Sequence, residues 1–541
     1  MIQVVRSPRK GGYDYVVIGS GSAGSVVASR LAEDSARTVV LIEAGGSDLS
    51  IDGSMPAAIG LPLISDRYNW KYFGMPEMRR GQDVGVYQPC GKVLGGSSSI
   101  GRMNWTRGNR EDYDSWASYG VQGWSYDEVL PFLKMSEAFE GGDDRFRGSQ
   151  GPIQVERSKA DNPLFQAFLA AGVEAGHGVN HDHNAAHQSG VHRIQHNIGN
   201  GRRMSASFAY LHNRPVRPNL DVLLDARVVR IIFQGHCCVA VEVVKNRTRI
   251  TIPVHQEAIC CAGALVSPQL LMLSGVGHAD HLRQLGIPVV SHLPAVGQGL
   301  SDHICFCVEY EVKDSRESDA QTLRFGGGLT PGLEWLLSRR GPLTSGLFEV
   351  GAMLSSDQTV SRPDMQIECL AARSSFGAGE ISIAPGFQCV VSLQRPTSTG
   401  LVWLSSADPF APPAFRFNYL RTEHDRKLAV VALRQLRDLM NQPSMVTKLK
   451  GEVGEQVACR TDKTLLSWAK RVAKSSYHSS CTLRMGSGEG SVVDSSGKVH
   501  GFDNLRVVDA SIFPTIPTAN LYAPTIMLAE KISADLIRVS A

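Results

Sequence analysis

Apolar runs separated by a Gly-rich turn and a helix-like segment open the chain. The run YDYVVIGS, which starts at Tyr13, is typical of a buried strand, and AGSVVASRLAED then has helical spacing at Val26, Val27 and Leu31. A second apolar run, RTVVLIEAGG, follows and includes Ala44. The strand–helix–strand order predicts an α/β fold with a parallel sheet in this part of the chain.

Further apolar runs predict more strands. They are DVLLDARVVRIIF (221–233), EAICCAGA (257–264) and NLRVVDASIF (504–513). The middle of the chain has a different pattern, because short strands such as those in QRPTSTGLVWLSSADPFAPPAFRF alternate there with Pro and Gly turns. We therefore expect an α+β domain over 311–460, built on an antiparallel sheet with covering helices.

Composition narrows the class of protein. The chain has 541 residues, of which 43% are hydrophobic and 20% charged, as is usual for globular proteins. Its net charge of +3 is too small to indicate a nucleic acid or an anionic membrane surface as a partner. Glycine is abundant, at 54 residues, which favours tight turns and loops that contact a ligand.

Cysteine usage and the terminal sequence indicate a cytoplasmic protein. The 11 cysteines cannot all pair within the chain, so we expect reduced thiols. The start MIQVVRSPRKGG has no apolar run of signal-peptide length. The apolar stretch from Ala258 to Val276 contains Gly, Ser, Pro and Gln, so we expect a core strand and helix there and no membrane span.

The first candidate binding motif is GSGSAG, from Gly19 to Gly24, which fits the pattern G-x-G-x-x-G. Gly19 permits the tight turn, Gly21 lets the backbone approach a pyrophosphate, and Gly24 lets the helix pack closely on the strand. The helix N-terminus then offers free N–H groups to phosphates. Glu43 ends the second strand, where an acid can bind ribose hydroxyls. The motif predicts a dinucleotide site, for either NAD or FAD.

The second candidate motif is GKVLGGSSSIGRMNWTRG, from Gly91 to Gly108. Its glycines and hydroxyl residues would lose much conformational entropy on folding, so we expect backbone that lies close to a ligand. A buried flavin needs a long cradle for its ribityl chain and ring, whereas an NAD site would have no use for this stretch. The motif therefore favours FAD.

Five ordered motifs together resemble the glucose-methanol-choline (GMC) family of flavin-dependent oxidoreductases. They are GSGSAG with IEAGG, GKVLGGSSS, GALVSPQLLMLSGVG, YHSSCTLRMG and the C-terminal NLRVVDASIFPTIPTANLYAPTIMLAEKISADLI. The resemblance covers essentially the whole chain and is greatest to the branch of sorbose dehydrogenase, choline dehydrogenase and hydroxymethylfurfural oxidase. It implies an FAD-binding domain assembled from residues 1–155, 156–310 and 461–541, with 311–460 as the substrate-binding domain.

The resemblance also implies the residues that hold FAD. The glycine turn would bind the pyrophosphate, Glu43 the adenosine ribose, and the backbone of Val228 the adenine. Asp509 and Ala510 would lie under the ribityl chain and pyrophosphate. The implied cofactor-binding set is Gly19, Gly21, Ser22, Ala23, Gly24, Glu43, Ala44, Leu94, Gly95, Gly96, Ser97, Ser98, Ser99, Val228, Asp509, Ala510, Asn520, Pro524 and Thr525.

The sequence departs from the family pattern near the flavin. Ile100 stands where members with covalent FAD carry a histidine, so we expect noncovalent FAD. Gly101 replaces a common Asn, Arg102 replaces a common Gly, and Tyr522 replaces the second Asn of N-x-N-x-P-T. These three departures affect the fine geometry of the site and the shape of the pocket.

The resemblance places a catalytic histidine at His478, in SSYHSSCTLRMG. Alcohol oxidation moves a hydride to flavin N5 while the hydroxyl loses a proton, and an imidazole with a pKa near ~6.5 suits that task. Asn520 occupies the second catalytic position, where its amide can donate a hydrogen bond to the alcohol oxygen. We therefore expect His478 to be the general base and Asn520 an orienting donor.

Four other side chains are weighed against structural roles. His303, in LSDH, has a family-like context, and Glu349, in LFEVGAM, could face the pocket or form a salt bridge. Cys481 lies close to His478 but is not expected to act as a nucleophile, and Arg484 is expected to serve packing or charge balance near the flavin. Neither a haem CxxCH motif nor an iron–sulfur spacing occurs, and we expect no metal.

The leading hypothesis is an FAD-dependent dehydrogenase or oxidase that acts on a small alcohol and passes electrons to O2, a quinone or a dye. A lyase or photodecarboxylase on the same fold is the alternative, and a noncatalytic protein that kept the fold is a third possibility. The sequence does not specify the substrate, the acceptor or the oligomeric state.

Overall fold

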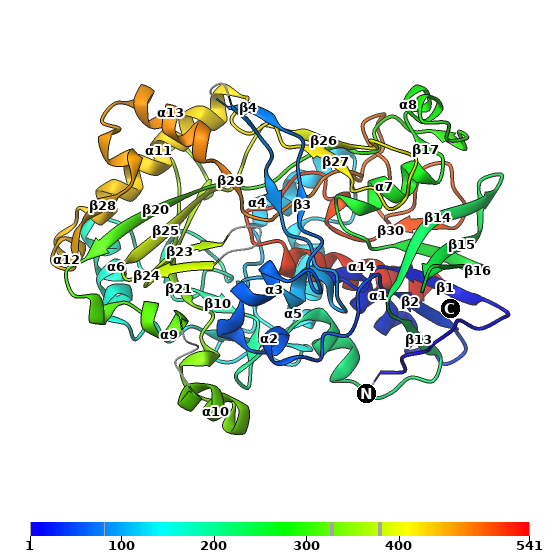
Figure 1. Ribbon diagram of the computed structural model, residues 1–541, viewed down its shortest axis with the longest axis horizontal. Helices are drawn as coiled ribbons and strands as arrows, with labels where there is room; N and C mark the ends of the chain where they lie inside the picture. The colour runs from blue at the N-terminus through cyan, green and yellow to red at the C-terminus, as the bar shows by residue number, and fades with distance from the viewer. Residues whose placement is uncertain (1, 80–81, 325–328, 377–380, 540–541) are drawn as a thin grey trace.

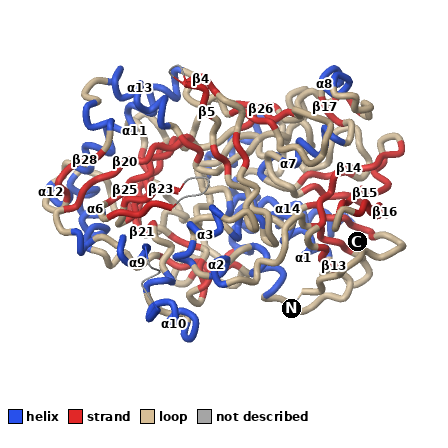
Figure 2. Tube along the Cα trace, viewed as in Figure 1, coloured by secondary structure: helices blue, strands red, loops and turns tan. Residues whose placement is uncertain are grey.

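Two large β-sheets lie at opposite ends of the molecule (Figure 1). The computed structural model describes residues 2–79, 82–324, 329–376 and 381–539. Loops and short helices occupy much of the region between the two sheets (Figure 2). The predicted combination of a parallel α/β sheet with an antiparallel α+β sheet is confirmed.

The first sheet carries the dinucleotide motif. Its strand order is β13-β2-β1-β16-β15-β14, and β30 also pairs with β16. Pairing is parallel among β13, β2, β1, the last part of β16 and β30, and antiparallel from the first part of β16 to β14. The bounds are β1 Tyr13–Ile18, β2 Val39–Ile42, β13 Leu220–Leu223, β14 Ala226–Gln234, β15 Cys237–Lys245, β16 Thr248–Cys260 and β30 Leu505–Val507.

One predicted strand is divided in the structure. The run DVLLDARVVRIIF forms two strands, because the chain turns at Asp225, whose φ is +53°. Before this turn β13 pairs in parallel with β2, and after it β14 pairs antiparallel with β15. The prediction of one continuous strand was wrong because the apolar pattern does not reveal a left-handed residue between two partners.

Two helices that are far apart in the sequence cover the parallel sheet. Helix α1 (Ser22–Leu31) packs against α14 (Tyr522–Val539). The Arg30 guanidinium makes a two-pronged ion pair with the fully buried Glu530, with N–O distances of 2.7 and 2.8 Å. The hydroxyl of Tyr210 donates to the same carboxylate at 2.7 Å. The C-terminal helix is therefore joined to the first helix of the dinucleotide motif.

The second sheet is antiparallel, in the order β28-β20-β25-β22-β21-β9, and β29 also pairs with β20. Helices α6 (Pro163–Glu174), α11 (Glu423–Met440) and α13 (Asp462–Val472) share its hydrophobic core. The strands are β9 Gly190–Arg193, β20 Ile304–Val312, β21 Phe348–Leu354, β22 Met365–Leu370, β25 Phe387–Leu393, β28 Leu449–Val453 and β29 Lys474–Ser475.

Alternation along β22 gives this sheet two different faces. Met365, Ile367 and Cys369 belong to the core beneath the helices, whereas Gln366 and Glu368 line a cavity on the other face. This follows from the two-residue period of a strand. The sheet also takes β9, β29 and most of β20 from outside residues 311–460. The four-part division of the chain into domains stays a prediction.

The remaining elements are short or lie at the periphery. The helices are α2 Ile51–Ser54, α3 Gly60–Ile64, α4 Arg110–Asp114, α5 Tyr126–Ser136, α7 Val266–Leu273, α8 Ala279–Gln284, α9 Ala320–Arg324, α10 Leu329–Ser338 and α12 Pro443–Val446. The strands are β3 Tyr72–Phe73, β4 Glu77–Arg79, β5 Gln82–Val84, β6 Tyr87–Gln88, β7 Glu137–Phe139, β8 Ile153–Arg157, β10 Gln195–His196, β11 Ile198–Gly199, β12 Arg202–Arg203, β17 Val276–Gly277, β18 Ser291–His292, β19 Gln298–Leu300, β23 Arg373–Phe376, β24 Ile381–Ala384, β26 Gly400–Trp403 and β27 Ala414–Arg416.

The most apolar stretch of the sequence lies in the core. Residues 258–276 comprise the end of β16, helix α7 and the start of β17, as predicted. Across the described ranges, none of the helices has both the length and the apolar character needed to cross a bilayer.

Candidate active site

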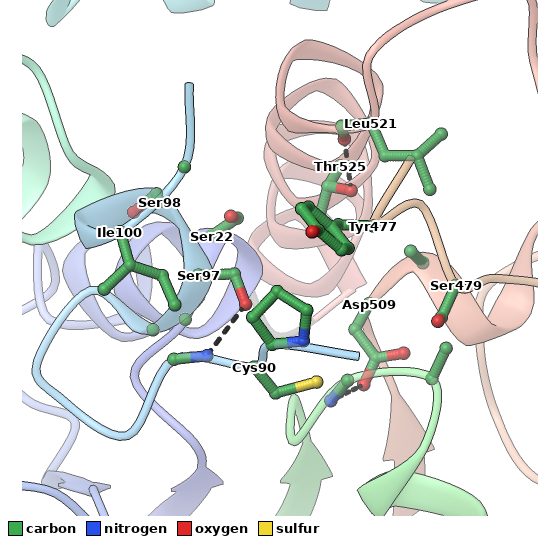
Figure 3. A pocket seen from close by; sticks show the side chains of 18 of the residues that line it. Ser22, Cys90, Ser97, Ser98, Ile100, Tyr477, Ser479, Asp509, Leu521 and Thr525 are labelled. Atoms are coloured by element: carbon green, nitrogen blue, oxygen red, sulfur yellow. Dashed lines mark hydrogen bonds between the residues drawn. The ribbon is translucent and has the colours of Figure 1, made fainter. Parts of the chain in front are cut away.

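A cavity of about 330 Å³ contains parts of every predicted motif. Its walls come from the turn between β1 and α1, the segment around Gly96, strand β22, the loop around His478 and the start of α14. In Figure 3, Ser22, Ser97 and Ile100 lie on one side of this cavity, and Asp509 and Ser479 lie across from them. Segments far apart in the sequence thus form one site.

The glycine turn has the geometry that a dinucleotide motif requires. Gly19 has φ +93°, and a Cβ on Gly24 would lie 1.9 Å from the carbonyl oxygen of Gly19. A Cβ on Gly21 would meet no atom within 4 Å, and Gly21 lines the cavity. Helix α1 begins at Ser22 without a side-chain cap, so its first N–H groups are free for an anion.

Glu43 is a buried carboxylate at the edge of the cavity. It accepts hydrogen bonds from the backbone N–H of Ser20 at 3.0 Å, the Ser20 hydroxyl at 2.6 Å and the Gly45 N–H at 2.8 Å. Burial raises the pKa of Glu43, and these hydrogen bonds oppose the rise. The acid is therefore held in a fixed orientation beside the glycine turn.

The segment from Leu94 to Ser99 touches the glycine turn directly. Gly95 and Gly96 have φ of +87° and +54°, and a Cβ on Gly96 would lie 2.6 Å from the Cα of Gly21. Gly96, Ser97 and Ser98 line the cavity, whereas Leu94, Gly95 and Ser99 do not. The Ser99 hydroxyl donates to the Leu94 carbonyl at 2.8 Å, which holds the turn closed.

Asp509 fixes a second loop at the cavity wall. Its Oδ2 accepts from the Gly263 N–H at 2.8 Å and from the Ser267 hydroxyl at 2.6 Å. Gly263 has φ +88°, and a Cβ there would meet no atom within 4 Å. Of the other predicted residues, the lining includes Gly19, Ser22, Ala23, Ala44, Val228, Ala510, Asn520 and Thr525, but neither Gly24 nor Pro524.

His478 lies on the loop after β29 and lines the cavity. Its backbone N–H donates to Asp302 Oδ1 at 2.8 Å, and its Nδ1 lies 2.9 Å from Nδ1 of His303. Burial, together with the nearby positive charge of Arg102, holds the pKa of His478 well below the ordinary value. The imidazole is therefore neutral at neutral pH and able to accept a proton.

Asn520 precedes α14 and is engaged on both sides of its amide. Its Oδ1 accepts from the Thr106 hydroxyl at 3.1 Å and from Gln366 Nε2 at 3.2 Å. Its Nδ2 donates to Glu368 Oε1 at 3.2 Å, which leaves its second amide hydrogen for a ligand. These contacts fix which way the amide faces.

None of the four other candidate side chains, His303 included, lines the cavity. Glu349 is instead bound by the Ala160 N–H at 2.6 Å and the Ser345 hydroxyl at 2.5 Å. Burial raises the pKa of the Cys481 thiol to about 11, so it is protonated at neutral pH. Arg484 lies against Gly299. Among the residues described, no cluster of three or more His, Cys, Asp or Glu side chains could hold a metal ion.

Sequence reasoning missed a polar group on the wall beside Asn520. Glu368 and Gln366 face the cavity from β22, and Asn104 and Arg102 face it from within the second motif. The alternation in MQIECL was the available signal, since it puts Gln366 and Glu368 on one face of the strand.

Comparison with known proteins agrees with the motifs and the fold. Two regions match the GMC oxidoreductase family, residues 13–305 and residues 396–529. The oxygen-dependent choline dehydrogenase of Staphylococcus saprophyticus is 41% identical over 540 residues, which cover 98% of this chain and 95% of that protein. The enzyme of the same name from Burkholderia cenocepacia is 40% identical, covering 97% of this chain and 93% of that protein.

Solved structures share the fold over nearly the whole chain. Pyridoxine 4-oxidase from Mesorbium loti is 28% identical with a TM-score of 0.86, covering 97% of this chain and 99% of that one. A variant of Aspergillus oryzae formate oxidase, studied for its effect on FAD modification, is 26% identical with a TM-score of 0.89, covering 98% of each chain. The chain therefore belongs to the GMC oxidoreductase family, whose members bind FAD.

Proposed function

We propose that the chain oxidises the CH–OH group of a small alcohol to an aldehyde or ketone, with His478 as the general base and Asn520 as the orienting donor. The observation that carries this proposal is the position of a neutral, partly buried imidazole and a fixed amide on the cavity that also contains the glycine turn. An imidazole near a substrate hydroxyl is a common general base.

The cavity residues fit FAD. Gly21 and Gly263 leave space for a cofactor, because a Cβ at either residue would meet no protein atom within 4 Å and a side chain there would fill that space. Glu43 offers a fixed carboxylate to ribose hydroxyls. The residues that would hold FAD are Gly19, Gly21, Ser22, Ala23, Glu43, Ala44, Gly96, Ser97, Ser98, Val228, Asp509, Ala510 and Thr525. When bound, FAD supplies the acceptor for the hydride that leaves the carbinol carbon.

The FAD is proposed to be noncovalent. Ile100 is buried and lines the cavity at the position where covalent members carry a histidine. Its aliphatic side chain has no nucleophilic atom with which to form a bond to the flavin. Precipitation of the purified protein with acid should therefore leave all of the flavin in the supernatant, whereas yellow colour in the pellet would contradict noncovalent binding.

The proton path begins at the Nε2 atom of His478. If the His478 Nδ1–H donates to His303 Nδ1, the lone pair on His478 Nε2 is free to take the hydroxyl proton. The bond from the His478 backbone to Asp302 fixes the loop in this position. Asn520 would donate its second amide hydrogen to the substrate oxygen and hold the hydroxyl toward the base.

The identity of the alcohol and of the electron acceptor belongs to the same proposal. The similar dehydrogenases are named for choline and for oxygen, so O2 is the proposed acceptor, with a quinone or dye as the alternative. No observation on the cavity residues favours a lyase or photodecarboxylase. A cytoplasmic location stays a prediction from the sequence.

The decisive experiment is anaerobic mixing of the purified yellow protein with a panel of alcohols. Bleaching of the flavin absorbance together with formation of an aldehyde or ketone is the expected result. Product without bleaching would indicate a lyase, and a protein that stays colourless after reconstitution with FAD would overturn the proposal. Reoxidation with O2, a quinone and a dye in parallel then identifies the acceptor.

A further inference from the structure

Glu368 is a buried acid whose oxygens are already occupied. Its Oε1 accepts from Asn104 Nδ2 at 2.5 Å, from Gln366 Nε2 at 3.2 Å and from Asn520 Nδ2 at 3.2 Å. Its Oε2 accepts from Arg102 Nη1 at 3.3 Å. Only 5% of its side-chain surface is exposed. Glu368 therefore anchors the amide of Asn520 and has little capacity left for a ligand.

Arg102 is more available than its partner. Its side chain is 26% exposed and lines the same cavity as His478 and Asn520. The contact with Glu368 is a single long one, and within the described part of the chain no other hydrogen bond to this guanidinium is found. The guanidinium carbon also lies 4.6 Å from the centre of the Phe348 ring, which holds the group in place.

We infer that Arg102 is a substrate-binding residue that recognises the carboxylate of a hydroxy acid, so that the preferred substrates are anionic alcohols. The inference rests on the proposed function and adds the substrate class. A guanidinium with unused N–H donors in a fixed plane is suited to a carboxylate. The oxidation is otherwise the one proposed above: the carbinol hydrogen leaves as hydride to FAD, the hydroxyl proton goes to His478, and the product is an oxo acid.

A cationic alcohol fits the same wall less well. A quaternary ammonium group is usually bound by open aromatic faces or by an unpaired carboxylate. Here Arg102 already covers the face of Phe348, and Glu368 accepts four hydrogen bonds. A second cation would also meet the charge of Arg102 itself. At this part of the wall, Arg102 and the occupied Glu368 therefore favour an anion over the cation of choline.

The test compares alcohols that differ in the group at the far end of the molecule. The anionic substrates are glycolate, 3-hydroxypropanoate and 4-hydroxybutanoate. Their neutral counterparts are ethanol, 1-propanol and 1-butanol, and choline is the cationic alcohol. With the purified flavoprotein, we expect kcat/KM to be highest for one of the hydroxy acids and lowest for choline. Arg102→Gln should lower kcat/KM for that acid by roughly 10- to 100-fold, as expected for loss of a hydrogen bond to a charged group. The same substitution should change kcat/KM for the neutral alcohols much less.

Binding without turnover provides an independent readout. Propanoate, which has no hydroxyl to oxidise, should bind the wild-type flavoprotein and perturb its absorbance, and Arg102→Gln should weaken this binding by a similar factor. Arg102→Lys, which keeps the charge, should recover part of it. Arg316→Gln, which removes a guanidinium with 89% of its side-chain surface exposed, is the matched control and should change neither readout.

The outcomes separate the two proposals. If no alcohol bleaches the flavin of the wild-type protein, the proposed function fails. If alcohols bleach it but choline or the neutral alcohols are preferred, or if propanoate binds equally to wild type and Arg102→Gln, the assignment of Arg102 is overturned while the proposed function stands. Flavin content and the Arg102→Lys variant distinguish loss of recognition from failure to fold.

Discussion

The Nδ1 atoms of His303 and His478 lie 2.9 Å apart, and their two rings meet at an angle of 86°. One of these nitrogens must donate and the other must accept. Burial lowers the pKa of His303 to about 3, so both rings are neutral at neutral pH. The pair therefore determines which nitrogen of His478 is left with a lone pair facing the cavity.

Replacing His478 by Ala tests its role as the base. We expect the rate of anaerobic flavin reduction by the best alcohol to fall roughly 10²–10⁴-fold, the usual contribution of a general base. Stopped-flow absorbance at the flavin band measures this rate directly. His424→Ala, which removes an exposed imidazole on α11, is the control and should reduce at the wild-type rate. A His478→Ala protein with normal FAD content that also reduces near the wild-type rate would exclude the assignment.

The pH dependence of flavin reduction follows from the lowered pKa of His478. A base with an ordinary pKa near ~6.5 would lose half of its activity at that pH. Because burial keeps the pKa of His478 well below this value, the active neutral form persists as the pH falls. We expect the rate constant for reduction to stay flat from pH 8 to below pH 6.5, and to decline only in more acidic solution. A midpoint at or above the ordinary value would contradict the buried geometry.

His303 is expected to act as a positioning residue. His303→Leu removes the partner of His478 Nδ1, so the imidazole can rotate or take the other tautomer, and flavin reduction should slow by at least about tenfold. A purely structural role would not alter titration of the base. Because neutral His303 accepts the Nδ1–H of His478 and so favours the protonated form of this base, its loss should also shift the acidic limb of the pH profile downward. His303→Asn keeps a hydrogen-bonding group at this position and should retain more activity than His303→Leu. If both variants lose the same activity and neither shifts the pH profile, only packing at this position matters.

The sequence revealed the local parts of the site well. The α/β class, the family and the glycine turn could be read from it because each depends on residues close together in the chain. Gly24 is a clear case, since the spacing alone requires a residue without a side chain where the helix meets the turn. The roles assigned to His478 and Asn520 stay predictions, although both line the cavity that contains the turn.

What the sequence did not reveal depends on distant contacts. Arg102 and Glu368 are 266 positions apart, and their pairing is determined by how β22 lies over the second motif. Glu349 was weighed as a pocket residue, yet a register irregularity between Phe348 and Val350 accompanies its turn toward Ala160. Such features arise from tertiary packing, which a one-dimensional pattern does not encode.

Gly24→Ala tests the glycine turn. The added Cβ would lie 1.9 Å from the Gly19 carbonyl oxygen, so α1 has to shift away from the strand and disturb the phosphate site. We expect the purified variant to lose most of its FAD, measured as the ratio of flavin to protein absorbance. Gly488→Ala adds a methyl group in open space and should keep a full complement of flavin. Full FAD content in Gly24→Ala would show that the turn tolerates a side chain.

Arg30→Met tests how strongly the C-terminal helix depends on its ion pair with α1. The substitution leaves the Glu530 carboxylate, which has no exposed surface, with the Tyr210 hydroxyl as its remaining hydrogen-bond partner among the described residues. Breaking a buried pair by removing one member usually costs about 3–5 kcal/mol, because the other charge stays buried without compensation. Arg283→Met breaks an exposed pair with Asp280 and should cost less than about 1 kcal/mol.

Thermal unfolding of the two holoproteins should therefore show a clearly lower midpoint for Arg30→Met alone. Since Asn520 lies two residues before α14, weaker anchoring of this helix should also loosen the site and release flavin at a lower temperature than in wild type. Equal midpoints for the two variants would mean that apolar packing alone holds the helices together.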